Sequence, residues 1–260
     1  MHGHSLGQDE PATVLLTGLG VPARWWHALG ADEGEVAGLL HSPPWNGRPC
    51  LAPLLAASGQ VITYDRAGIG ESGPPTAPRD LNDFVEELGA VMAAASVTRP
   101  VRLVGHSVGG VIALTFARRR PELVASLVLL DSSHPDQLAR FAAVASPDEL
   151  EAGADDRRQT ALHHPERPEL ESLLGQGPLH PGELGDLPLL TVSRAPGATL
   201  YVREQVWSQL QRNLTSLAPA ARHLTLPGTG HYVHLDRPES VARAIFQQAG
   251  AAESSDSGAR

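Results

Sequence analysis

The sequence predicts an α/β fold: a mostly parallel, doubly wound sheet covered by helices, with a small helical cap. Short apolar runs rich in Val, Ile and Leu alternate along the chain with longer segments of helical period. This alternation is typical of buried parallel strands joined by crossover helices. With 260 residues and 42% hydrophobic content, the chain is long enough to build one such domain around its own core.

Six runs are predicted to be strands, because each is short, aliphatic and bounded by polar or turn-forming residues. They cover residues 13–17, 60–64, 101–105, 126–130, 187–192 and 222–226. Apolar residues recur every three or four positions from Leu81 to Met92, which predicts a helix with one buried face. Further helices are expected over residues 199–217 and from about Pro238, since proline suits the first position of a helix.

The domain organisation follows from where this alternation stops. We expect a single domain over residues 1–260, interrupted at about residues 132–186 by an acidic, proline-rich segment with short helical pieces. Because this segment follows a predicted strand, we interpret it as a cap inserted over the sheet. The small and polar residues from about position 250 predict a disordered tail.

Composition excludes several classes of function. The formal net charge of −9 disfavours nucleic acid as a partner, because phosphate binding needs a concentrated basic face. The chain contains no lysine, which excludes Schiff-base and pyridoxal-phosphate chemistry through a lysine amine. Cys50 is the only cysteine, so an internal disulfide and a cysteine metal cluster are excluded. Serine, histidine and carboxylate chemistry remains, and we expect neither a cofactor nor a metal.

The sequence carries no signal for a membrane or for export. No uninterrupted apolar stretch reaches the roughly 18 residues of a membrane span, and the first residues lack the basic and apolar regions of a signal peptide. We therefore expect a cytoplasmic protein with no membrane partner. The oligomeric state stays open.

The pentapeptide Gly-x-Ser-x-Gly, which marks a nucleophilic serine on a tight turn, occurs twice. The first copy, GHSLG, spans residues 3–7, and we expect neither a strand before Ser5 nor a helix after it. The second copy, GHSVG, spans residues 105–109 between a predicted strand and VGGVIALTFARRR, which can form a helix. This context favours Ser107 as the nucleophile. The alternative is that Ser107 only caps the helix.

A glycine-rich motif, GIGESG at residues 68–73, follows a predicted strand and matches the dinucleotide-binding pattern. Pro74 and Pro75 follow at once, so no helix N-terminus opens there to receive a pyrophosphate. We therefore do not expect a nucleotide site.

Three motifs of the chain resemble motifs of the α/β-hydrolase superfamily. GHSVGG is similar to its nucleophile elbow, YDRAGIGESG to the loop after the preceding strand, and GTGHYVHLDRPESV to its catalytic-histidine segment. They occur in the family's order, and the resemblance extends over residues 13–248. A serine hydroxyl is a weak nucleophile near neutral pH, so Ser107 needs a base. The resemblance implies that this base is His231. His234 is the nearest alternative.

The carboxylate that orients the histidine departs from the commoner family pattern. Most relatives place it after the strand that we predict at residues 187–192, where this chain has no acid before Glu204. Some relatives instead place it after the strand that follows the nucleophile helix. That strand ends here at Asp131, which we take as the acid. Asp136 and Glu204 are alternatives, as is a purely structural role for Asp131.

An oxyanion hole needs two aligned N–H donors. The resemblance assigns one to the backbone amide of Val108, which follows the nucleophile. It assigns the other to Leu19 in LLTGLG, where Thr17 occupies the position of the family's usual histidine. Because both donors are backbone groups, the change to threonine does not remove the hole.

These assignments predict a cofactor-independent serine hydrolase that cleaves a carboxylic ester or lactone with an apolar acyl group through an acyl-enzyme. Trp25, Trp45 and Trp207 are candidate walls of the substrate pocket, although a core position is the more ordinary role for a large aromatic. The same triad could pass the acyl group to an alcohol or amine, or cleave a C–C bond beside a carbonyl. A non-catalytic small-molecule receptor is the alternative from a different class.

Overall fold

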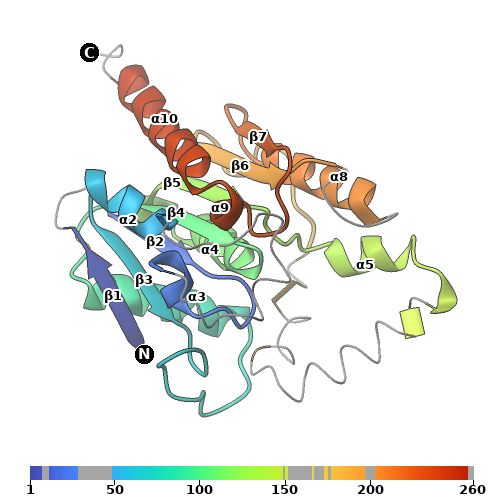
Figure 1. The fold of residues 1–260 in the computed structure, drawn as a ribbon, viewed down its shortest axis with the longest axis horizontal. Helices are drawn as coiled ribbons and strands as arrows, with labels where there is room; N and C mark the ends of the chain where they lie inside the picture. The colour runs from blue at the N-terminus through green and yellow to red at the C-terminus, as the bar shows by residue number, and fades with distance from the viewer. Residues whose placement is uncertain are drawn as a thin grey trace.

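A seven-stranded sheet forms the centre of the protein (Figure 1). The structure is a computed structural model that describes residues 1–7, 12–28, 49–148, 150–151, 166, 173–174, 177–196 and 203–256. The strands are β1 (His2–Leu6), β2 (Thr13–Leu16), β3 (Val61–Asp65), β4 (Val101–His106), β5 (Val124–Leu130), β6 (Leu189–Arg194) and β7 (Arg222–Leu226). Their order is β1-β3-β2-β4-β5-β6-β7, and every neighbouring pair is parallel except β1 with β3. This confirms the predicted mostly parallel α/β sheet.

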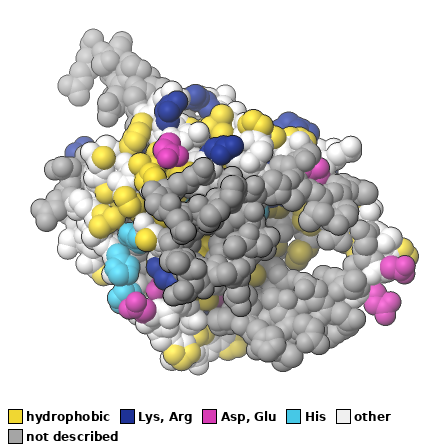
Figure 2. Space-filling model, viewed as in Figure 1, with side chains coloured by type: hydrophobic (Ala, Val, Ile, Leu, Met, Phe, Trp, Pro, Cys, Tyr) yellow, Lys and Arg dark blue, Asp and Glu magenta, His cyan; other side chains and the backbone are white. Residues whose placement is uncertain are grey.

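The edge strand β1 is the strand that the sequence did not predict. Its sequence, HGHSL, lacks an apolar run, because β1 pairs only with β3 and leaves most of its residues exposed. The expectation that no strand surrounds Ser5 was therefore wrong, since Ser5 lies within β1, opposite Ile62. Figure 2 shows histidine side chains gathered at this edge, where the rings of His2 and His4 lie 4.7 Å apart.

Helices cover both faces of the sheet (Figure 1). They are α2 (Leu51–Leu55), α3 (Leu81–Ala94), α4 (Val108–Arg119), α5 (Gln137–Ala142), α8 (Arg203–Thr215), α9 (Val233–Asp236) and α10 (Pro238–Asp256), with short 3-10 turns η1 (Ala23–Trp26), η2 (Ala56–Ser58) and η3 (Pro121–Leu123). Leu103 of β4 packs in a core with residues of α3 and α4, whereas Val104 packs in a second core with residues of α2 and α10. Burial on both faces explains why the central strands appear in the sequence as continuous apolar runs.

The predicted helices are present where the structure describes them. The Asp80 side chain caps α3 in a reciprocal arrangement with Asp83. Helix α10 begins at Pro238 as expected, but it continues to Asp256 and so includes residues 250–256, for which composition predicts a disordered tail. None of the helices within the described ranges is long and apolar enough to cross a membrane.

The glycine-rich loop after β3 closes around the carboxylate of Asp65. That carboxylate accepts hydrogen bonds from the amides of Ala23 (2.6 Å) and Glu71 (3.0 Å). Gly70 has a φ of +54°, and a Cβ at this position would overlap the Asp65 side chain. The glycine is therefore required by the close approach within the turn. No helix begins directly after the loop, because α3 starts only at Leu81.

Candidate active site

Ser107 lies on the sharp turn between β4 and α4, at the sheet edge where the carboxyl ends of parallel strands meet. Its backbone has φ +53° and ψ −123°, a combination that residues with a side chain rarely adopt. Ser107 occupies the N-cap position of α4, yet its hydroxyl makes no capping hydrogen bond. The geometry therefore disfavours a capping role and agrees with a turn built to present the serine.

Two glycines allow the chain to turn this sharply. A Cβ on Gly105 would lie 2.5 Å from the carbonyl oxygen of Gly109, and a Cβ on Gly109 would lie 2.5 Å from the carbonyl oxygen of Thr17. Side chains do not approach backbone oxygens so closely, so β4, α4 and the loop after β2 can meet only with glycine at both positions. The Gly-x-Ser-x-Gly pattern at residues 105–109 is thus explained by packing of the turn itself.

Asp131 directly follows β5 and is fully buried. Its amide donates to the carbonyl oxygen of Val192 in β6 at 2.7 Å. Its carboxylate accepts hydrogen bonds from His231 Nδ1 (2.7 Å), Trp207 Nε1 (2.8 Å) and the amide of Arg194 (3.2 Å). The guanidinium of Arg194 also binds the carboxylate. These donors hold the Asp131 carboxylate in one orientation.

The same donors determine the charge of Asp131. Burial alone would raise the pKa of Asp131, but the hydrogen bond from His231 and the positive charge of Arg194 outweigh that effect. The pKa of Asp131 therefore lies below its usual value. The carboxylate is ionised at neutral pH, as the orientation of an imidazole requires.

His231 lies in the loop between β7 and α9. Two groups compete for its Nδ1: the carboxylate of Asp131 at 2.7 Å and the guanidinium of Arg194 at 3.4 Å. The contact with the carboxylate is shorter, and an ionised carboxylate can only accept a hydrogen bond. We therefore assign the ring proton to Nδ1, which donates it. The other ring nitrogen, Nε2, is then the basic one.

His106 links the serine turn to the histidine loop. Its ring lies 4.7 Å from that of His231, and its Nε2 lies 3.0 Å from the His231 carbonyl oxygen. Burial lowers the pKa of His106 to about 3, so the ring is neutral and can donate to this carbonyl. The described hydrogen bonds join His231 to Asp131 and His106 but not to the Ser107 hydroxyl. Such contacts are often long before substrate binds, and this one stays a prediction.

The alternative residues lie in different surroundings. His234 is buried in α9 with its ring 4.5 Å from that of His106, and burial lowers the pKa of His234 well below its usual value. The Asp136 carboxylate is half exposed and lies 4.0 Å from His134 Nδ1. Glu204 lies in the first turn of α8. Among the acids considered, Asp131 is the one that contacts the His231 ring.

The loop after β2 passes directly beside the nucleophile. A Cβ on Gly18 would lie 3.2 Å from the Cβ of Ser107, so the backbone next to Leu19 borders the serine turn. Val108 is the first residue of α4, where helix amides have no acceptor within the helix. Both predicted oxyanion donors therefore lie at the elbow, and their catalytic role stays a prediction.

The three tryptophans considered for the pocket differ in position. Trp25, in η1, is partly buried, with its ring 5.7 Å from that of Tyr232. Trp207 is buried in α8, where its indole N–H binds the carboxylate of Asp131. Trp45 lies outside the described residues. Trp207 therefore supports the carboxylate, a role that no local sequence pattern indicates.

Arg194 is the residue of this site that the sequence interpretation missed. It ends β6, the strand after which most relatives carry the acid. Its guanidinium binds Asp131 and lies 4.8 Å over the ring of Trp207. The available signal was an arginine at the end of a strand that no acid follows before Glu204, because a cation there can pair with a carboxylate on the neighbouring strand.

The described residues offer little for a metal ion. Across these ranges, no three His, Cys, Asp or Glu side chains come together as metal ligands would. The loop that resembles a nucleotide-binding motif is closed on the carboxylate of Asp65. We therefore assign neither a metal nor a nucleotide to these parts of the described structure.

Comparison with known proteins agrees with this fold. A sequence model of the family described as alpha/beta hydrolase fold matches residues 33–187, which is more than half of the chain. The chain therefore belongs to the α/β-hydrolase fold family.

Individual relatives differ in how much of the chain they cover. The chain is 28% identical to the uncharacterized protein YqjL of Bacillus subtilis over 243 residues, 94% of this chain and 85% of that protein. It is 39% identical to "Putative carbamate hydrolase RutD" of Azorhizobium caulinodans over 125 residues, 48% of this chain and less than half (42%) of that protein. A thermophilic esterase from Thermogutta terrifontis shares the fold, with a TM-score of 0.60 at 18% identity over 96% of this chain and 93% of that chain.

Proposed function

We propose that the protein is a cofactor-independent serine hydrolase that cleaves a carboxylic ester or lactone through an acyl-enzyme. The observation that carries the proposal is the 2.7 Å contact between His231 Nδ1 and the buried Asp131 carboxylate, beside the strained turn of Ser107. This bond leaves the second ring nitrogen of His231 available as a base. An esterase and a protein named for carbamate hydrolysis among the similar proteins support acyl chemistry.

In the proposed reaction, His231 Nε2 takes the proton of Ser107 while the serine oxygen attacks the substrate carbonyl. The resulting oxyanion accepts hydrogen bonds from the amides of Leu19 and Val108, each worth roughly 3 kcal/mol. The imidazolium then gives its proton to the leaving alcohol as the C–O bond breaks. Water, deprotonated by His231, then attacks the acyl-enzyme; the bond to the Ser107 oxygen breaks, the imidazolium returns its proton to that oxygen, and the acid is released. Asp131 stays ionised and stabilises the imidazolium throughout.

We propose a small-molecule substrate with an apolar acyl group, bound between the sheet edge and the cap. The adjacent rings of Trp25 and Tyr232 support this choice, since Tyr232 follows the proposed base directly. The formal net charge of −9 favours neutral substrates over strongly anionic ones. The name of the Azorhizobium relative adds carbamates to the candidates.

A substrate panel tests the proposal. Short-chain p-nitrophenyl esters, aliphatic lactones and carbamates are offered to the unmodified protein, to Ser107→Ala and to Ser5→Ala. Ser5 is a matched control, because it occupies the other Gly-x-Ser-x-Gly copy but lies exposed in the edge strand β1. We expect Ser107→Ala to lose at least roughly 10³-fold in activity and Ser5→Ala to keep it.

The outcome of the panel also separates the alternatives. Hydrolysis that survives in Ser107→Ala contradicts the proposal. An ester product formed with added alcohol indicates acyl transfer instead of hydrolysis. Turnover of a diketone series, with no turnover of esters, indicates C–C bond cleavage by the same residues.

A further inference from the structure

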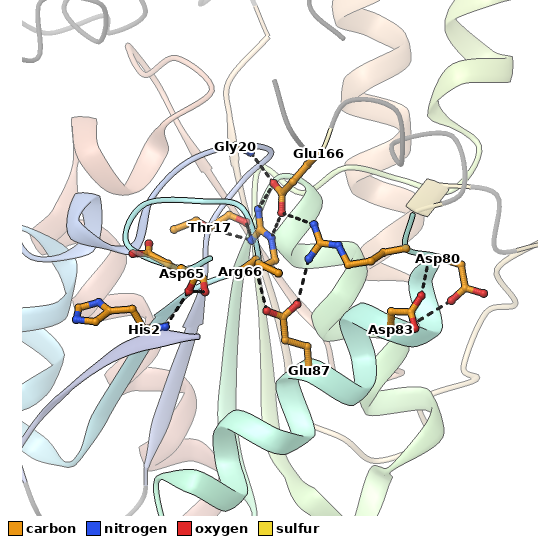
Figure 3. A network of polar contacts seen from close by, with 12 residues as sticks. His2, Thr17, Gly20, Asp65, Arg66, Asp80, Asp83, Glu87 and Glu166 are labelled. Carbon is orange, nitrogen blue, oxygen red and sulfur yellow. Dashed lines mark hydrogen bonds and ion pairs between the residues drawn. The ribbon is translucent and has the colours of Figure 1, made fainter. Parts of the chain in front are cut away.

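A fully buried ion pair lies against the loop that carries Leu19. The side chains of Arg66 and Glu166 are 2% and 1% exposed. Figure 3 shows both at the centre of a polar network that includes Thr17 and Gly20. Burying two charges costs several kcal/mol per ion, and apolar side chains of similar size often stabilise a fold as well or better. Stability alone is therefore a weak reason for this pair.

Every N–H group of the Arg66 side chain has an acceptor. Nε and Nη2 donate to the two oxygens of Glu166 at 2.6 and 2.8 Å, which is the bidentate arrangement. Nη2 also donates to the carbonyl oxygen of Gly18 at 2.6 Å. Nη1 donates to the carbonyl oxygen of Thr17 at 2.8 Å and to its hydroxyl at 3.1 Å. The planar guanidinium therefore fixes two successive carbonyls relative to each other.

Glu166 holds the other side of Leu19. Its Oε2 accepts a hydrogen bond from the amide of Gly20 at 2.7 Å. The backbone groups before and after Leu19 are thus bound to the two members of one ion pair. Glu166 lies within the range of residues that the sequence predicts as a cap, so a residue of that range contacts the loop after β2.

The bond to Gly18 acts on the predicted oxyanion donor itself. A peptide group is planar and trans, so the carbonyl of Gly18 and the N–H of Leu19 are fixed in one plane and point in opposite directions. A cation bound to this carbonyl sets the direction of the N–H and polarises it. The same peptide borders the nucleophile, because a Cβ on Gly18 would lie 3.2 Å from the Cβ of Ser107.

Both members of the pair keep their charges. Burial would lower the pKa of Arg66, but the carboxylate of Glu166 raises it above its usual value. Burial would raise the pKa of Glu166, but the charge of Arg66 lowers it below its usual value. The contacts of the loop are therefore constant over the pH range in which a histidine acts as a base.

We propose that Arg66 and Glu166 are positioning residues for the oxyanion hole, which fix and polarise the Gly18–Leu19 peptide. The inference rests on the proposed serine hydrolysis. It also accounts for Thr17 at the position of the family's usual histidine, since both oxygens of Thr17 accept hydrogen bonds from Arg66.

The double variant Arg66→Met/Glu166→Leu provides the test. Removing Arg66 alone leaves the buried Glu166 carboxylate with Arg79, 3.8 Å away, as its remaining cationic partner among the described residues, and is expected to destabilise the fold more than replacing both groups by apolar ones. Arg102→Met is a matched control, because Arg102 is a buried arginine near the start of β4, at the opposite end of that strand from Ser107. Each protein is reacted with a fluorophosphonate, and the maximal labelling rate and the half-saturating concentration are measured together with Tm.

We expect the double variant to keep its Tm within a few degrees and its half-saturating concentration, while the maximal labelling rate falls about 100-fold. Arg102→Met should label like the unmodified protein. If the pair had a merely structural role, the double variant would have a changed Tm. Its maximal labelling rate and its half-saturating concentration would then change together. If the double variant does not fold, Glu166→Gln, which keeps the side-chain shape, should lower the maximal rate about tenfold.

Two failures are distinguishable. An unchanged maximal labelling rate in a folded double variant, or in Glu166→Gln where only that variant folds, overturns the role of the pair and leaves the proposed function intact. No labelling of the unmodified protein overturns the proposed function and this role with it.

Discussion

Arg66 and Arg194 both bind a buried carboxylate near the turn of Ser107, but their surroundings differ. Arg66 binds Glu166 and backbone oxygens, and none of these partners changes its charge near neutral pH. Arg194 binds Asp131, which it shares with His231. The imidazole is the group that gains and loses a proton in the proposed reaction.

The difference shows how similar ion pairs can serve different purposes. A guanidinium whose donors all have fixed partners holds geometry, and removing it moves backbone atoms. A guanidinium that shares a carboxylate with an imidazole helps to keep that carboxylate ionised, because opposite charges attract. We therefore expect the Arg66 cluster to determine position and the Arg194 cluster to determine the pH range of activity.

The largest effect is expected for Asp131→Asn. The variant keeps the shape of the side chain but removes the charge that orients His231 and stabilises its protonated form, so kcat on a p-nitrophenyl ester should fall at least roughly 10³-fold. Asp136→Asn is the matched control, because Asp136 is half exposed and lies beside His134 instead of His231. Near-full activity of Asp131→Asn would move the orienting acid elsewhere.

The residues of the candidate active site that the sequence predicted are those marked by a local pattern. Ser107 lies on a turn that only flanking glycines permit, and Asp131 directly follows a predicted strand. His231 was located through its resemblance to a family motif. Their placement at one sheet edge follows from parallel topology.

The partners of these residues were not predictable in the same way. Arg66 and Glu166 are 100 residues apart, and Trp207 lies 76 residues from Asp131, so no periodicity or spacing connects them. The edge strand β1 was missed for a related reason, since an exposed strand has no apolar run to mark it. Contacts made by single side chains across the fold depend on packing that no local pattern encodes.

An intermediate effect is expected for Arg194→Gln. The Arg194 guanidinium binds the Asp131 carboxylate and helps to hold the pKa of Asp131 below its usual value. Without it, the pKa of Asp131 rises toward its usual value, so Asp131 loses its charge at a higher pH and the acidic limb of the pH–activity profile should move upward. Activity below the new midpoint is lost, while activity at high pH is kept.

The neighbouring histidines do not obscure this shift. Burial lowers the pKa of His106 to about 3 and lowers the pKa of His234 well below its usual value, so both stay neutral across the profile. Arg120→Gln, which removes an exposed arginine paired with Glu86, is the control and should leave the profile in place. A profile of Arg194→Gln that matches the unmodified protein would refute the proposed role of this cluster.

The smallest effect is expected for Trp207→Phe. This change keeps an aromatic ring in α8 but removes the indole N–H that binds Asp131, one donor among several. We expect kcat to fall about tenfold, in line with one hydrogen bond to a charged group. Trp26→Phe is the control, since the Trp26 indole is also buried but has no hydrogen-bond partner among the described residues. Equal effects of the two changes would indicate that Trp207 contributes packing only.

The most direct measurement maps the site of fluorophosphonate labelling by mass spectrometry in the unmodified protein and in His231→Gln. Exposed His4, in the edge strand β1, provides the control variant His4→Gln. If His231 activates Ser107, the label lies on Ser107, His4→Gln labels normally, and His231→Gln labels at least roughly 10³-fold more slowly. A label on another residue, or an undiminished rate in His231→Gln, would contradict the account.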